Sequence, residues 1–258
     1  MKPLSTPNSA LFLDVTVPNT ARIFDYLAGG VANFEVDRQA AEQMLQIIPS
    51  LRKWVRLRRA FIQEAVQLLS TEGFRQFLDL GSGMPTEDHI HAFAPDAQII
   101  YCDVNPVAVS YGNSLFSRME NVAYIHGDVR EIETILSAPE VQQRLDRRVK
   151  VAIGLNALIL FLSEADNCRL AQALFQWAPP DSQLFLVFQT RAGGQVPEKY
   201  IRFQTLCADA GLPLQLYTLE QNIGMLEPWR PVRVEPITEF LGLPADFISE
   251  TDREGIGM

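Results

Sequence analysis

The sequence predicts an α/β protein, a mostly parallel sheet with flanking helices, preceded by a helical N-terminal segment. After Gly73, short apolar runs alternate with amphipathic segments, which is the pattern of repeated βαβ units. Before Gly73, apolar residues recur at helical spacing over 19–28, 34–48 and 51–69. The chain has 258 residues, of which 47% are hydrophobic, and this is enough to bury a core of that kind.

The individual elements follow from the same periodicity. Strands are expected over 76–80, 98–102, 122–125, 149–155 and 184–188, and helices over 86–93, 106–117, 129–136, 166–177 and 199–210. The apolar pieces at 214–217 and 232–234 bring the expected sheet to seven strands, of which the last is antiparallel. We divide the chain into a flexible tail with a helical cap over residues 1–72 and an α/β domain over residues 73–258.

The net charge of -9 disfavours nucleic acid as a partner, because a phosphate backbone would be repelled. One basic cluster stands against this trend and lies within the predicted helix at 51–69. We interpret it as a solvated helix face rather than a phosphate-binding patch. Its members are Arg52, Lys53, Arg56, Arg58 and Arg59.

Cysteine usage and the lack of a targeting pattern predict a cytoplasmic protein with no membrane partner. Cys102, Cys168 and Cys207 are too far apart for a disulfide framework or a CxxC pair. No stretch reaches the roughly 18 apolar residues of a membrane helix. His89 and His91 form an HxH pair without a third ligand at suitable spacing, so we predict no metal site.

The strongest local signal is the run FLDLGSGMPT at residues 77–86, in which an apolar strand, an acid and two glycines precede a helix. Glycine permits a positive φ and leaves room for a ligand to approach the main chain at the end of a strand. A GxG turn alone is nearly as often structural as cofactor-binding. With its neighbours, it makes Asp79, Gly81, Ser82 and Gly83 candidate ligand contacts.

Polar residues follow the next three predicted strands as well. Asp103 lies where a carboxylate can accept both ribose hydroxyls of a nucleoside. Asp128 lies where a carboxylate can accept the exocyclic amine of an adenine, and Asn156 brings an amide to the same edge. Together with Val104 and Val129, these residues predict a nucleoside site at the carboxyl edge of the sheet.

The helix start after the glycines distinguishes two nucleoside cofactors. A dinucleotide fingerprint has a third glycine there to seat a pyrophosphate, whereas this chain has Met84, Pro85 and Thr86. An acid at Asp79 before a shorter GxG suits a ligand that carries an ammonium and a sulfonium and no phosphate. The pattern therefore favours S-adenosylmethionine over a nicotinamide dinucleotide.

Several motifs together resemble a known family. The runs RIFDYLAGG at 22–30 and FLDLGSGMPT, with Asn33-Phe34, Asp37-Arg38 and Trp229-Arg230-Pro231, are similar to the bacterial S-adenosyl methyltransferases first catalogued as a domain of unknown function. The similarity spans roughly residues 17–240. It implies a Rossmann-like class I methyltransferase fold with a helical N-terminal extension, S-adenosylmethionine as cofactor and S-adenosylhomocysteine as product.

The resemblance has gaps and implies no methyl acceptor. This chain has Ala28 and Val31 where the family commonly has leucine and lysine, and residues 156–161 lack a histidine that the family often places there. The polar residues of the N-terminal motif therefore have two interpretations, a network of caps and ion pairs or a segment folded over the cofactor. On the second interpretation, Tyr26 and Asn33 bind the cofactor. The candidate catalytic bases are Asp25, Tyr26 and His126.

The function predicted from these observations is methyl transfer from S-adenosylmethionine to a small-molecule acceptor. A non-catalytic nucleoside-binding protein that regulates or partners a biosynthetic enzyme is an alternative. A nicotinamide-dependent oxidoreductase is a second alternative, which Pro85 disfavours. The pattern does not indicate an oligomeric state.

Overall fold

The computed structural model describes residues 14–191, 196, 198–209, 213–244, 246–249 and 252. Most of the predicted tail therefore lies outside the described residues. The helices and strands run in the order α1 (Thr20–Ala28), α2 (Glu35–Ile47), α3 (Leu51–Thr71), β1 (Gln76–Leu80), α4 (Ile90–Phe93), β2 (Gln98–Asp103), α5 (Pro106–Leu115), β3 (Val122–His126), α6 (Ile132–Leu136), α7 (Pro139–Arg144), β4 (Ala152–Gly154), α8 (Glu164–Trp177), β5 (Gln183–Phe185), α9 (Glu198–Asp209), α10 (Leu219–Met225) and α11 (Ile237–Phe240).

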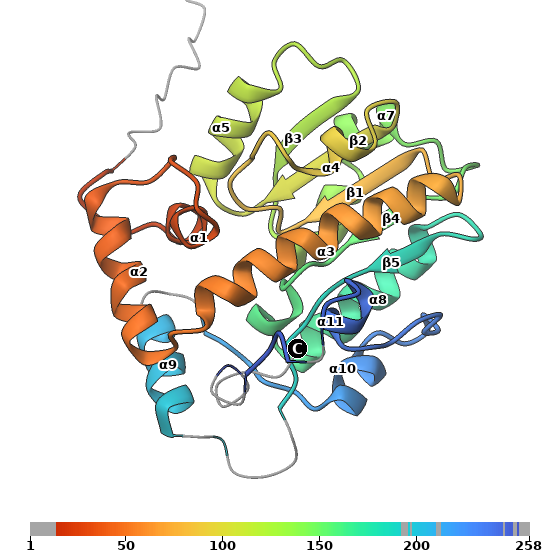
Figure 1. Ribbon diagram of the computed structural model, residues 1–258. Helices are drawn as coiled ribbons and strands as arrows, with labels where there is room; N and C mark the ends of the chain where they lie inside the picture. The colour runs from red at the N-terminus through yellow and green to blue at the C-terminus, as the bar shows by residue number, and fades with distance from the viewer. Residues whose placement is uncertain are drawn as a thin grey trace, which may run out of the picture.

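The five strands form one parallel sheet in the order β3-β2-β1-β4-β5, with helices on both faces (Figure 1). Strand β1 is buried along its whole length, as a central strand covered on both faces should be. One face packs against α6, α7 and α8, and the other against α3 and α5. The predicted α/β architecture with a mainly parallel sheet is confirmed.

The prediction of seven strands is wrong for the described part of the chain. Near 214–217 the backbone makes only an isolated parallel bridge, between Thr190 and Tyr217. The stretch at 232–234 forms no strand, so the described residues contain no antiparallel last strand. Pro231 and Pro236 flank that stretch, and because proline has no N–H to donate to a strand ladder, neither position can extend a strand there as a donor.

The N-terminal helices were predicted correctly, and their ends follow local rules. The Asn19 side chain accepts a hydrogen bond from the Arg22 N–H and caps α1, which ends at Gly29 with a left-handed φ of 96°. A buried ion pair of 2.7 Å between Arg22 and Asp37 fastens α1 to α2. The long helix α3 then crosses one face of the sheet, with α1 and α2 beside its first half (Figure 1).

Element ends differ from prediction mainly around the loops. The helix expected over 86–93 begins only at Ile90, and the strand expected over 149–155 is reduced to Ala152–Gly154. The short helices α7, α10 and α11 were not predicted. None of the helices in the described ranges has both the length and the apolar character needed to cross a bilayer.

Candidate functional site

The turn after β1 has the positive backbone φ angles that were expected at its two glycines. Gly81 and Gly83 have φ values of 72° and 71°, which side chains rarely tolerate. The Gly81 N–H donates to the Cys102 carbonyl at 2.8 Å, and the Gly83 N–H donates to the Asp103 carboxylate at 2.7 Å. A Cβ added at Gly81 would lie 2.9 Å from Leu158, so this loop approaches its neighbour closely. The turn is thereby tied to the end of β2.

The strand ends meet at one edge of the sheet, where they open onto a cavity of about 380 Å³. Pairing of Leu80 with Cys102 and of Asp79 with Gly154 aligns the ends of β1, β2 and β4. A volume of this size is typical of small-molecule sites. Nine of the predicted cofactor residues line the cavity, namely Asp79, Gly81, Ser82, Gly83, Asp103, Val104, Asp128, Val129 and Asn156.

Asp79 is the most perturbed acid in the cavity. Burial raises the pKa of its carboxyl to about 7, and the nearby charge of Asp103 acts in the same direction. The His89 Nε2 lies 3.9 Å from this carboxyl, but burial lowers the pKa of His89 to about 3. The imidazole is therefore neutral near pH 7, and it gives Asp79 no counter-charge. A ligand that brings a cation would supply it.

Asn156 supplies an independent test of whether a ligand fits. Asn156 is 9% exposed, and its amide lies close enough to the Asp79 carboxyl to lower the pKa of that group, yet neither Nδ2 nor Oδ1 has a partner at full hydrogen-bond geometry among the described residues. A buried amide left unpaired costs free energy, and such groups in native proteins usually have a ligand or water as partner. The donor and acceptor of Asn156 thus suit the polar groups of S-adenosylmethionine.

The two other predicted acids differ in how they are held. Asp103 is buried and accepts the N–H groups of Gly83 and Asn105 at 2.7 and 2.8 Å, and burial raises its pKa. Asp128 is more exposed, and hydrogen bonds from the Arg130 side chain lower its pKa. The Asn105 side chain also donates to Asn19, at 2.9 Å, which connects the cap of α1 to this edge of the sheet.

The N-terminal helices contribute a wall of the cavity that sequence reasoning left mostly unassigned. Phe24 and Asp25 of α1 and Val55, Arg58 and Ile62 of α3 line it. Positions 55, 58 and 62 share one helix face. An arginine on this otherwise apolar face was the sequence signal that could have indicated a role for Arg58 in the cavity. The interpretation of the basic cluster as solvated is therefore wrong for Arg58.

A smaller apolar cavity of about 40 Å³ adjoins the first between the N-terminal helices, the loop after β4 and α9. The two cavities share Phe24, Val55, Arg58, Ala157 and Phe161 in their walls. Trp54, Leu160 and Phe203 line the smaller cavity alone, and most of its lining is apolar.

Two of the predicted cofactor residues do not line the main cavity. The Tyr26 hydroxyl donates to Glu42 at 2.7 Å on the outer side of α1. Asn33 donates to the carboxylate of Asp25 at 2.9 Å and to the Gly30 carbonyl. Arg38 in turn donates to Asn33, so this part of the motif forms a network of caps and polar contacts. Of the three candidate bases, Asp25 alone lines the main cavity.

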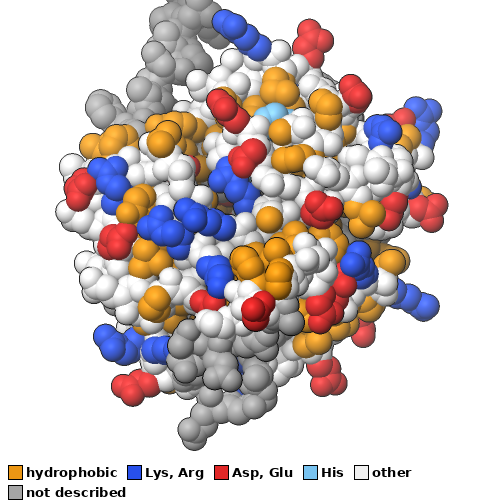
Figure 2. All heavy atoms as spheres, in the orientation of Figure 1, with side chains coloured by type: hydrophobic (Ala, Val, Ile, Leu, Met, Phe, Trp, Pro, Cys, Tyr) orange, Lys and Arg blue, Asp and Glu red, His pale blue; other side chains and the backbone are white. Residues whose placement is uncertain are grey.

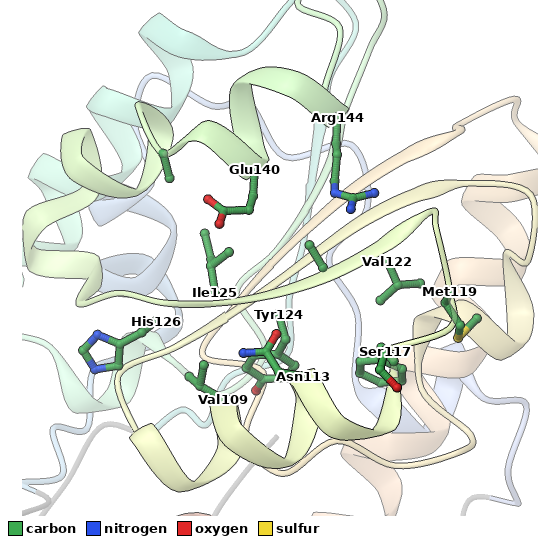
Figure 3. Close-up of a pocket in the computed structure, with 13 residues that line it drawn as sticks. Val109, Asn113, Ser117, Met119, Val122, Tyr124, Ile125, His126, Glu140 and Arg144 are labelled. Carbon is green, nitrogen blue, oxygen red and sulfur yellow. The ribbon is translucent and has the colours of Figure 1, made fainter. Parts of the chain in front are cut away.

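His126 lies in a different hollow, along the free edge of β3. Figure 3 shows it at the end of that strand, with Asn113 of α5 and Ser117 of the following turn on one side and Glu140 and Arg144 of α7 on the other. This hollow measures about 580 Å³ and contains none of the residues of the glycine turn. His126 Nε2 contacts the Val104 carbonyl at 3.0 Å. We therefore place the candidate site in the smaller cavity at the strand ends, because that cavity contains the glycine turn and the predicted acids Asp79, Asp103 and Asp128.

The side chains of His89 and His91 pack against Tyr101. Both rings contact Tyr101 edge-on, with centroids at 4.7 and 6.3 Å, and His91 Nδ1 lies 3.1 Å from the Tyr101 hydroxyl. Within the described residues, no group of three or more His, Cys, Asp or Glu side chains is arranged to hold a metal ion.

Comparison with known proteins agrees with this geometry. A family model described as S-adenosyl methyltransferase matches residues 7–227. The chain belongs to this family. As a family member, it is a methyltransferase that uses S-adenosylmethionine, and neither alternative function is favoured.

Two solved structures resemble the chain over nearly its full length. A methyltransferase candidate from Thermobifida fusca YX is 29% identical, with a TM-score of 0.75 over 89% of this chain and 92% of that one. A DUF574 family protein from Streptomyces avermitilis is 25% identical, with a TM-score of 0.80 over 93% and 95%.

A more distant structure shares the fold alone. Geranyl diphosphate C-methyltransferase from Streptomyces coelicolor, solved with S-adenosylhomocysteine, is 11% identical, with a TM-score of 0.50 over 92% of this chain and 79% of that one. No curated protein matches the chain.

Proposed function

We propose that this family member transfers the methyl group of S-adenosylmethionine to a small-molecule acceptor held beneath the N-terminal helices. The observation that carries the proposal is that α1 and α3 line the same cavity as the glycine turn, Asp103 and Asn156. A site covered by helices in this way favours a small acceptor over a macromolecule. The net charge of -9 also argues against nucleic acid.

In the proposed donor site, each part of S-adenosylmethionine has a matching group. Asp103 suits the ribose hydroxyls, Asp128 and Asn156 suit polar groups of the nucleoside, and Asp79 suits the cationic tail. The adjoining apolar cavity, with Trp54 and Phe161 in its wall, suits an apolar part of the acceptor.

The residues of the chain have a limited chemical task in such a transfer. A lone pair of the acceptor bonds to the methyl carbon while the carbon–sulfur bond breaks, and its electron pair stays on sulfur, which becomes a neutral thioether. The cavity walls orient the acceptor in line and exclude water. A hydroxyl or ammonium acceptor must also lose a proton, and Asp25 is our candidate to accept it.

The test is calorimetric titration of the protein with S-adenosylmethionine, S-adenosylhomocysteine and NADH. We expect micromolar binding of the two thio-nucleosides, a loss of at least about tenfold in Asp103→Ala, and no binding of NADH. Asp146→Ala is the matched control, because Asp146 pairs with Arg148 on the surface and does not line the cavity. Binding of NADH in place of the thio-nucleosides would overturn the donor site.

Turnover is tested separately with labelled S-adenosylmethionine and a panel of small apolar hydroxyl, amine and carbon acceptors, alongside protein and RNA. Label that appears only in macromolecules would contradict the small-molecule acceptor. Tight binding without S-adenosylhomocysteine formation from any acceptor would favour the non-catalytic alternative.

We also propose a cytoplasmic location, because the three cysteines are all free thiols in the structure.

A further inference from the structure

The five basic residues of α3 have three different environments. Three of them are ion-paired: Arg52 with Glu42, Lys53 with Asp252 and Arg59 with Asp88. Arg56 is exposed. Arg58 lines the main cavity and makes no hydrogen bond or ion pair with any residue in the described ranges. Figure 2 shows several Lys and Arg side chains close together over the N-terminal helices, which is the side of the molecule that carries α3.

Arg58 is held in surroundings that leave its guanidinium without a hydrogen-bonded partner among the described residues. Its guanidinium carbon lies 5.4 Å from the centre of the Phe24 ring. Burial lowers the pKa of Arg58 to about 10, so the group is still a cation at neutral pH. A guanidinium in a partly desolvated site needs hydrogen-bond acceptors, and it pairs best with a carboxylate or phosphate.

The main cavity also holds an acid without a counter-charge, Asp79. The charge of Asp79 raises the pKa of Arg58 and that of Arg58 lowers the pKa of Asp79, so the two groups attract each other through the cavity. No ion pair joins them directly. A cation and a carboxyl that line one cavity without pairing are complementary to a ligand with both charges, and an α-amino acid is such a ligand.

We propose that Arg58 binds the α-carboxylate of the amino acid tail of S-adenosylmethionine, while Asp79 accepts its ammonium. The inference rests on the donor site proposed above and adds to it a residue from the helical cap. Arg58 then makes the cap part of the donor site, and it selects donors that carry a carboxylate. Arg59 is the less suitable neighbour, since Asp88 already pairs with it.

The experiment compares two ligands that differ by this carboxylate alone. S-adenosylmethionine and decarboxylated S-adenosylmethionine share the adenosine, the sulfonium and the ammonium. We expect the parent protein to bind the first more tightly by about 10- to 100-fold, the range for a charge-assisted hydrogen bond. In Arg58→Met that preference should fall to within about twofold, because only the carboxylated ligand loses a contact.

The matched control is Arg56→Met, which removes an exposed arginine two positions away on α3 and should leave the preference unchanged. Arg58→Gln is a second variant with a neutral polar head, and comparing two ligands on one protein cancels general damage to the fold. An equal weakening of both ligands, or no weakening of either, overturns the role of Arg58. A higher KM for the acceptor with an unchanged donor preference also overturns it. If the parent binds neither ligand, the donor site itself has failed.

Discussion

The protonation state of Asp79 makes both the charge in the cavity and the stability of the protein depend on pH. Burial raises the pKa of its carboxyl from 3.8 to about 7, so the ligand-free folded protein holds a proton that the unfolded chain has lost. The stability that this group contributes is therefore full below about pH 4, and it is lost as the pH rises through 7. Above pH 7, Asp79 is a buried carboxylate with no ion-pair partner. This state lowers the stability of the ligand-free protein, but it favours the binding of a cationic ligand.

We predict that Asp79→Asn stabilises the ligand-free protein relative to the parent, and that this difference grows between pH 5 and pH 8. The gain at pH 8 should be on the order of 1–3 kcal/mol, since the variant no longer buries a charge. Urea denaturation at several pH values measures it. The control is Asp128→Asn, because hydrogen bonds from Arg130 lower the pKa of Asp128 and give that group the opposite pH dependence. A difference for Asp79→Asn that does not vary with pH would contradict a raised pKa.

Helices α1 and α2 are held together by one charged contact between two almost fully buried side chains. Arg22 and Asp37 are 1% and 0% exposed, and Asp37 also accepts the N–H groups of Asn19 and Phe34 at 2.8 Å. Arg22 donates to the Val17 carbonyl as well, at 2.8 Å. This ion pair gives the polar N-terminal motif a structural role and positions Phe24 and Asp25 in the cavity wall.

Arg22→Met is expected to destabilise the protein by about 3–5 kcal/mol, because it leaves the Asp37 carboxylate buried without its cation. The free energy of unfolding from urea titration measures this loss. Arg148→Met removes an exposed arginine that pairs with Asp146, and it should change the stability by no measurable amount. Equal changes in the free energy of unfolding for the two substitutions would show that the buried ion pair contributes no more to stability than the exposed one.

The cap and the α/β part share a hydrophobic core across the whole molecule. Ile23 of α1, Met44 of α2 and Trp54 of α3 pack in one cluster with Leu160, which follows β4, and Val187, which follows β5. A cluster of this kind couples the stability of the two parts, so they should unfold together. The boundary between residues 72 and 73 remains a prediction about chain organisation and does not imply separate folding.

A ligand that bridges the cap and the strand ends should stabilise this whole unit. At a concentration of about 100 times its Kd, S-adenosylhomocysteine is expected to raise the melting temperature by about 5–10 °C in a single transition. Differential scanning calorimetry measures both the shift and the number of transitions. NADH at the same concentration serves as the negative control. Two separate transitions, with only one shifted by the ligand, would show that the cap does not share the site.

The sequence alone determined the longer helices, the five strands of the sheet and the strand-end residues of this protein. Helices and strands are set by apolar periodicity, and the turn at Gly81 and Gly83 by a backbone that glycine adopts easily, so both can be predicted from neighbouring residues. Asp103 and Asn156 were predictable for a related reason, since parallel strands bring their carboxyl ends to one edge.

Only the tertiary structure decided which faces of the N-terminal helices meet the cavity. Arg58 lies in its wall, whereas Tyr26 turns toward Glu42 on the outside, although both belong to amphipathic helices. The strand count was likewise decided by the structure, in which the predicted stretches at 214–217 and 232–234 form no strand. Periodicity describes a helix or strand by itself, and the environment of each side chain depends on contacts between segments far apart in the chain, which no local pattern specifies.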